Sequence, residues 1–99
     1  PTEEAFADAA AGVDWFSVPG MGVSMVDAKG AKSWPISTAS FILMYKEPTN
    51  KTESAEVLKF FDWAFKNGKQ MASDLDYVAL PDSLTGQIRS RVWSQINVK

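Results

Sequence analysis

The sequence predicts an α/β protein, mostly helical, with one strand buried inside a sheet. The main observation is the unbroken apolar run Phe41–Tyr45, whose length suits a strand and whose continuity suits burial on both faces. Two segments of helical periodicity follow it, over residues 49–68 and 82–96. A strand buried on both faces needs helices above and below it, so the combination is typical of an α/β fold.

The first expected element is a short helix near the start of the chain. Thr2 is a suitable N-cap, and Glu3 and Glu4 carry negative charge in the first turn, where the helix dipole favours it. Gly12 is the expected stop. Apolar residues recur at helical spacing between these ends: Phe6, Ala9, Ala10 and Val13.

Residues 14–33 predict little regular structure. Pro19, Gly20 and Gly22 exclude a long helix in this part of the chain. Val23–Val26 is a candidate for a short strand, and Asp27–Ser33 reads as a polar loop. The run Phe41–Tyr45 therefore remains the main expected strand.

A long helix is expected after the break at Glu47 and Pro48. Thr49 or Thr52 is the predicted N-cap, and Gly68 is the predicted end. Its apolar side chains form a belt wider than the stripe of about 100° that a surface helix shows. The members of the belt are Val57, Leu58, Phe60, Phe61, Trp63, Ala64 and Phe65. This width predicts a helix that is covered on most of its circumference.

The last expected helix begins near Pro81, with Asp82 or Ser83 as its cap. Gly86 in its interior costs about 1 kcal/mol relative to alanine. Its apolar residues follow at steps of four: Leu84, Ile88, Val92 and Ile96. These helices leave the buried strand without a partner, and each buried backbone group left unsatisfied costs about 1–3 kcal/mol. We therefore expect the rest of the sheet to belong to sequence outside this chain.

The composition disfavours several classes of function. The chain contains no cysteine and no histidine, which removes the usual general base near neutral pH and the commonest metal ligand, so we expect no enzyme, no metal site and no catalytic residue. The net charge is −2 and no Lys/Arg cluster stands out, so we expect no nucleic acid partner. No apolar stretch approaches the roughly 20 residues that span a bilayer, and the acidic start is unlike a signal peptide.

Two polar motifs suggest ligand binding but have simpler explanations. Asp74, Asp76 and Asp82 resemble a loose calcium loop, yet the glycine and the terminal glutamate of such a loop are absent, which favours capping and turn roles. A second set of hydroxyls precedes the apolar run and consists of Ser37, Thr38 and Ser40. They suit oxyanion donors, but turn chemistry at the entry to a strand is the simpler interpretation.

The tryptophans and the arginines are also candidate binding groups with simpler explanations. Aromatic platforms can stack on sugars, and the chain has four tryptophans: Trp15, Trp34, Trp63 and Trp93. Trp63 and Trp93 lie on helices rich in apolar residues, so packing is the favoured role. Arg89 and Arg91 are the only arginines, and two residues apart on a helix they do not share a face, which argues against an arginine clamp.

Three segments carry a resemblance to a known family. They are "WPISTASFILMYK" (Trp34–Lys46), "EVLKFFDWAFKNG" (Glu56–Gly68) and "DLDYVALPDS" (Asp74–Ser83), preceded by the opening "PTEEAFADAAAGVDW". In this order and spacing they resemble the carboxyl-terminal portion of the periplasmic phosphate-binding subunit of the high-affinity phosphate ABC transporter. The resemblance covers essentially the whole chain and is weakest over Phe16–Ser33.

The resemblance implies a two-lobed periplasmic binding protein of the type 2 solute-binding fold. Residues 1–33 would then belong to the second lobe, up to the last hinge crossing, and residues 34–99 would be the carboxyl-terminal segment of the first lobe. Neither range is a complete domain. The neighbours of the expected strand would be amino-terminal strands that this chain does not contain.

The resemblance also implies the function of the whole protein, which is capture of inorganic phosphate and its delivery to the ABC permease subunits. It implies a periplasmic, exported, monomeric, non-enzymatic protein without a cofactor, whose signal peptide is not in this chain. In the family, phosphate is held by helix N-termini, hydroxyls, one arginine and one aspartate of the amino-terminal and middle regions. None of these maps onto this chain, so no ligand-binding residue is assigned. The alternative is a self-contained α/β interaction or sugar-binding module.

Overall fold

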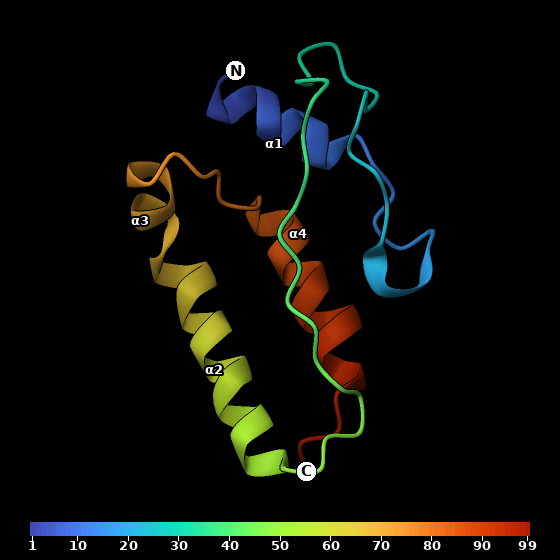
Figure 1. The fold of residues 1–99 in the computed structure, drawn as a ribbon, viewed down its shortest axis with the longest axis vertical. Helices are drawn as coiled ribbons and strands as arrows, with labels where there is room; N and C mark the ends of the chain where they lie inside the picture. Colours follow the sequence, from blue (N-terminus) through green and yellow to red (C-terminus); the bar gives the residue numbers. More distant parts are fainter. The chain divides into compact units, whose positions relative to one another are not determined.

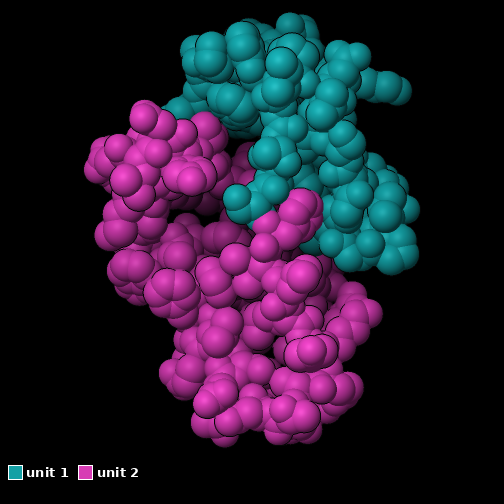
Figure 2. Space-filling model, viewed as in Figure 1, with its two compact units in different colours: residues 1–40 teal, residues 41–99 magenta.

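The computed structural model describes residues 1–99, which form two compact units, residues 1–40 and residues 41–99 (Figure 2). The first unit contains helix α1 (Glu3–Ala11) and the 3-10 turn η1 (Pro19–Met21). The second contains α2 (Lys51–Asn67), α3 (Lys69–Asp74) and α4 (Asp82–Gln87), followed by the π-helical turn η2 (Ile88–Val92) and the 3-10 turn η3 (Trp93–Gln95) (Figure 1).

Helix α1 begins and ends where the sequence predicts. The hydroxyl oxygen of Thr2 accepts a hydrogen bond from the backbone N–H of Ala5 at 3.1 Å, which satisfies one of the free donors of the first turn. Gly12 is the C-cap, and its N–H donates to the carbonyls of Asp8 and Ala9. The predicted caps of this helix are therefore confirmed.

The loop that follows in the first unit is held against α1 by polar contacts. One carboxylate oxygen of Asp8 accepts hydrogen bonds from the backbone N–H of Lys32 and from the hydroxyl of Ser33, each at 3.1 Å. The backbone N–H of Trp34 donates to the carbonyl of Ala5 at 3.1 Å. These bonds join residues more than 20 positions apart, so they fix an irregular segment without any strand or helix.

The small core of the first unit centres on Trp15. Its side chain is only 6% exposed, and its ring N–H donates to the carbonyl of Ala10 at 2.8 Å. Ala9, Ala10 and Met25 are buried as well. A buried indole normally finds a partner for its N–H, and here the end of α1 supplies it. Packing is therefore the role of Trp15.

In the second unit, α2 and the α4–η2 segment lie side by side and run in opposite directions (Figure 1). The N-cap of α2 is Asn50, whose side-chain oxygen accepts from the N–H of Glu53 at 3.1 Å. The prediction of Thr49 or Thr52 as the cap was therefore wrong by one or two residues. The helix ends at Gly68, as predicted.

The last predicted helix is present but is not one regular α-helix. Pro81 precedes it without a side-chain capping bond, and Asp82 is its first helical residue rather than its cap. After the six residues of α4 the chain changes to the π-helical turn η2 and then to η3. The short helix α3 was not predicted. The tail returns to the start of the unit, where the N–H of Asn97 donates to the carbonyl of Lys46 at 2.7 Å.

The predicted fold class was wrong, because no residue of 1–99 lies in a strand. The run Phe41–Tyr45 is drawn in Figure 1 as a plain tube, and it is exposed rather than buried, with Leu43 at 92% and Tyr45 at 83% exposure. A strand exists only when a neighbouring backbone pairs with it. The backbone groups of this run make no hydrogen bond within the chain, and the candidate strand Val23–Val26 is absent too.

The predicted division between residues 33 and 34 concerned the lobes of a larger protein and stays a prediction. None of the helices combines the length and the apolar character that crossing a bilayer requires.

Candidate functional site

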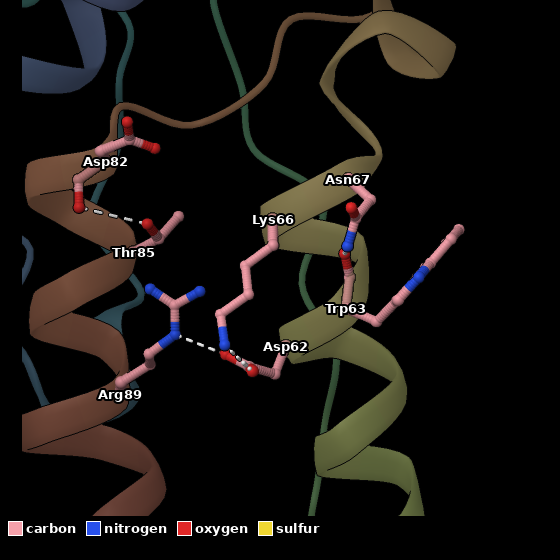
Figure 3. A network of polar contacts seen from close by, with 7 residues as sticks. All are labelled: Asp62, Trp63, Lys66, Asn67, Asp82, Thr85 and Arg89. Carbon is pink, nitrogen blue, oxygen red and sulfur yellow. Dashed lines mark hydrogen bonds and ion pairs between the residues drawn. The ribbon is translucent and has the colours of Figure 1, made fainter.

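The densest polar cluster lies between α2 and α4–η2 and centres on Asp62 (Figure 3). One carboxylate oxygen of Asp62 accepts from the Nε–H of Arg89 at 2.6 Å, and the other accepts from the ammonium of Lys66 at 2.7 Å. Lys66 stands one helical turn after Asp62, whereas Arg89 belongs to η2. The carboxylate therefore links two elements that are 27 positions apart in sequence.

These contacts lower the pKa of Asp62 below its ordinary value. The hydrogen bond from Lys66 is the largest cause, and the hydrogen bond from Arg89 is the second. Both donors are cationic, so they stabilise the ionised carboxylate. The pKa of Asp82 is lowered in the same way by the hydrogen bond from Lys69, at 2.6 Å. Both carboxyl groups are therefore ionised at neutral pH.

Aromatic rings continue the cluster on the Arg89 side. The guanidinium carbon of Arg89 lies 5.8 Å from the centre of the Phe65 ring, within the range of a cation–π contact. The ring of Phe65 stacks on Trp93 with centroids 5.6 Å apart and planes 5° from parallel. Phe65 thus joins α2 to η3 through its ring while Asp62 joins α2 to η2 through charge.

The hydrogen bonds of this cluster hold α2 and η2 together, which is a structural role. The carboxylate of Asp62 accepts from two cations and is therefore poorly suited to act as a general base. Thr85 is buried, and its hydroxyl donates to the carbonyl of Asp82 at 3.1 Å. Every buried side-chain polar atom has a hydrogen-bond partner, so no buried group points to an unseen ligand.

The candidate oxyanion donors and calcium ligands of the sequence are not brought together into a site. Ser37 is buried and donates its hydroxyl proton to the carbonyl of Trp34 at 2.8 Å, which is the turn role that the sequence favoured. Asp74 accepts from the side chain of Gln70, Asp76 adopts a left-handed backbone conformation with φ of 62°, and Asp82 pairs with Lys69. No three acidic side chains of residues 1–99 are grouped as metal ligands.

The four tryptophans are divided between the two units. Trp15 is buried in the first unit and Trp93 stacks on Phe65 in the second, which are packing roles. Trp34 and Trp63 are more exposed and belong to different units.

The sequence reasoning missed the pairing of Asp62 with Arg89. Only the spacing of Asp62 and Lys66, four residues apart on a predicted helix, was visible in the sequence as a signal for an ion pair. The spacing of Arg89 and Arg91 argues against an arginine clamp and indicates no other partner for Arg89. Its partner is an acidic residue on another helix, and no local pattern could identify that residue.

Comparison with known proteins gives a consistent match along most of the chain. The chain is 44% identical over 91 residues to the phosphate-binding protein PstS of Pasteurella multocida, and 44% identical over 91 residues to that of Haemophilus influenzae. It is 38% identical over 90 residues to that of Xylella fastidiosa strain 9a5c. These matches cover 91–92% of this chain but only 25–27% of the relatives.

The chain therefore spans about a quarter of the length of the curated relatives that it matches, and that quarter is their carboxyl-terminal part. The resemblance found in the sequence is thus confirmed. No family model matches the chain.

Proposed function

We propose that this chain is the carboxyl-terminal segment of a periplasmic phosphate-binding protein, which captures inorganic phosphate and delivers it to the permease of an ABC importer. The observation that supports the proposal is 44% identity over 92% of the chain with proteins named phosphate-binding protein PstS. The whole protein acts by binding and release rather than by catalysis, and the periplasm is its compartment. Chance similarity at this identity and coverage is an inadequate explanation.

This segment supplies framework rather than phosphate ligands. The two arginines of the chain are Arg89 and Arg91, and Arg89 is paired with Asp62. Lys66 and Arg89 donate to the carboxylate of Asp62, and Lys69 donates to that of Asp82, so each of these cations already has an acidic partner within the chain. The ligands of phosphate therefore belong to the remaining three quarters of the polypeptide.

Two titrations by isothermal calorimetry test the proposal. The isolated 99-residue chain is expected to show no saturable binding of inorganic phosphate. A chimera of the Pasteurella multocida relative, in which the matched 91 residues are replaced by the corresponding residues of this chain, is expected to bind phosphate within about tenfold of the parent protein. The parent lacking the 91 residues is the control.

The results that contradict the proposal are specific. Saturable micromolar binding by the isolated chain would place ligands here, and Ser37, Thr38 and Ser40 would be the first to examine. A folded chimera that no longer binds phosphate would show that this segment belongs to a protein of another specificity. The self-contained module is the weaker alternative, because it does not account for a match that covers 92% of the chain.

A further inference from the structure

Residues 67 and 68, where α2 ends and α3 begins, form the one Asn–Gly pair of the chain. An asparagine followed by glycine is especially prone to spontaneous deamidation, because glycine has no side chain beside its backbone nitrogen and adopts many backbone conformations. The other asparagines, Asn50 and Asn97, precede a lysine and a valine, whose side chains hinder that nitrogen. The sequence thus singles out Asn67 for this reaction.

The reaction converts the side-chain amide of Asn67 into a carboxylate through a cyclic imide. The backbone nitrogen of Gly68 attacks the side-chain carbonyl carbon Cγ of Asn67, and the new N–Cγ bond forms as the Cγ–Nδ2 bond breaks. The leaving nitrogen takes up the proton of the Gly68 N–H and departs as ammonia. A water molecule then adds to one of the two imide carbonyls and opens the ring, which leaves aspartate or isoaspartate at position 67.

In the folded chain both reacting nitrogens are held by the last turn of α2. The N–H of Gly68 donates to the carbonyl of Ala64 at 2.8 Å. The side-chain N–H of Asn67 donates to the carbonyl of Trp63 at 3.0 Å (Figure 3). Attack requires the Gly68 nitrogen to lose its hydrogen and to approach Cγ, so both hydrogen bonds must break first. The closed end of α2 therefore opposes ring closure.

The end of α2 can open without losing a large contact. Asn67 is exposed, and α3 is six residues long with no buried residue. The ion pair between Lys69 at the start of α3 and Asp82 of α4 is largely exposed, and such pairs contribute little to stability. Helix ends of this kind open locally at a small cost in free energy. Transient opening of the junction therefore gives Gly68 access to Asn67.

We propose that Asn67 is a site of spontaneous deamidation whose rate is set by the opening of the junction between α2 and α3. The product then keeps the junction open. A carboxylate at position 67 lies at the negative end of the α2 dipole and cannot donate to the carbonyl of Trp63. Isoaspartate also adds a methylene group to the main chain, which moves the N–H of Gly68 out of register with Ala64.

The test incubates the 99-residue chain at neutral pH, in buffer and in urea, and follows the three asparagines by mass spectrometry of proteolytic peptides. In urea we expect Asn67 to convert about tenfold faster than Asn50 and Asn97, because glycine leaves the attacking nitrogen unhindered. In buffer we expect Asn67 to convert more slowly than in urea by about fivefold or more, because the closed helix end protects it.

Gly68→Ala in urea is the control for the attacking nitrogen. It is measured in urea because a Cβ at position 68 would collide with the carbonyl of Ala64 in the folded helix. The added side chain is expected to slow the conversion of Asn67 about tenfold. Conversion at the wild-type rate would show that the Gly68 nitrogen is not the attacking group, and the proposal would fail.

Two other results would also overturn the proposal. Equal conversion of the three asparagines in urea would show that the Asn–Gly pair is not a preferred site. Equal conversion of Asn67 in buffer and in urea would show that the helix end does not control the reaction.

Asn67→Asp tests the effect of the product, with Asn67→Gln as the control that keeps an amide. The aspartate variant is expected to increase amide exchange in residues 69–74 by about fivefold or more. Equal exchange in the two variants would show that a carboxylate at this position does not hold the junction open.

Discussion

At the scale of single residues, Asp62 shows how a carboxylate on one helix fixes the position of another element. Its two oxygens accept from Lys66 on the same helix and from Arg89 on η2 (Figure 3). The pair with Lys66 is of a kind that stabilises isolated helices only slightly, whereas the pair with Arg89 specifies the packing of two elements. The stacking of Phe65 on Trp93 holds α2 against η3, the turn that follows η2, through apolar contact.

The pKa of Asp62 gives a prediction about pH. The folded-state pKa of Asp62 is lowered, so the ionised carboxylate stabilises the fold at any pH above the unfolded-state pKa of about 3.9. This stabilisation is lost as the pH falls through the lower folded-state pKa. Lys66→Met removes the largest cause, so the pKa of Asp62 is expected to rise toward its ordinary value. A carboxyl carbon titration by NMR measures it.

Lys59→Met is the control for that titration. Lys59 pairs with Glu56 and leaves Asp62 untouched, so the pKa of Asp62 should stay low in this variant. An Asp62 that titrates identically in both variants would show that the contact with Lys66 is not formed in solution.

At the scale of elements, the glycines at helix ends and inside helices have different roles. Gly12 was predicted only as the stop of α1. The structure adds that the backbone carbonyl of Lys29 approaches it so closely that a Cβ would collide with that carbonyl. The loop thus docks on the end of α1 because this position has no side chain.

Gly12→Ala is therefore expected to separate the loop from α1. Since the obstacle is backbone rather than a flexible side chain, the cost is expected to exceed about 1 kcal/mol and to increase amide exchange in residues 27–35 by about fivefold or more. Gly22→Ala is the matched control, because nothing lies within 4 Å of its Cβ position. Equal exchange in the two variants would mean that the loop does not dock on Gly12.

Gly86 leads to the opposite prediction. It lies inside α4 with open space where a Cβ would be, and its φ is not positive. Gly86→Ala is expected to stabilise the α4–η2 segment by about 0.5–1 kcal/mol through reduced entropy of the unfolded chain. Slower amide exchange at Ser90 and Val92 measures the gain. Faster exchange there would contradict the open space at the Cβ position of Gly86.

At the scale of the whole molecule, exposed apolar surface distinguishes this chain from a self-sufficient domain. The five residues of Phe41–Tyr45 have unpaired backbone groups, and the side chains of Leu43 and Tyr45 lie almost entirely in water. Apolar segments of this kind with unpaired backbone promote association with other chains. The exposed side chains of Val57, Phe60 and Trp63 on α2 add a second apolar area on the same unit.

The isolated chain is therefore expected to self-associate at micromolar concentration. Size-exclusion chromatography with light scattering should show species larger than 10.9 kDa. Leu43→Glu should shift them toward the monomer, because a charge opposes burial of the segment. Ser40→Glu, which adds the same charge at the exposed position just before the apolar run, should have a much smaller effect. A wild-type monomer with a cooperative melt would show that the chain is a domain in its own right.

The sequence by itself determined the elements whose signals are local. Helices α1 and α2 follow from apolar spacing, from Thr2 and from the glycines at positions 12 and 68, because capping and periodicity act within a few residues. The resemblance to phosphate-binding proteins also came from the residues alone, since it depends on their order and spacing.

Only the tertiary structure decided the features that need partners distant in sequence. The run Phe41–Tyr45 has the composition of a buried strand, but a strand requires a neighbouring backbone and none in residues 1–99 pairs with it. The partner of Asp62 is 27 residues away in η2, and the obstacle at Gly12 is a carbonyl of a loop. Local patterns fix the backbone within one element, whereas pairing between elements depends on which other surfaces the polypeptide contains.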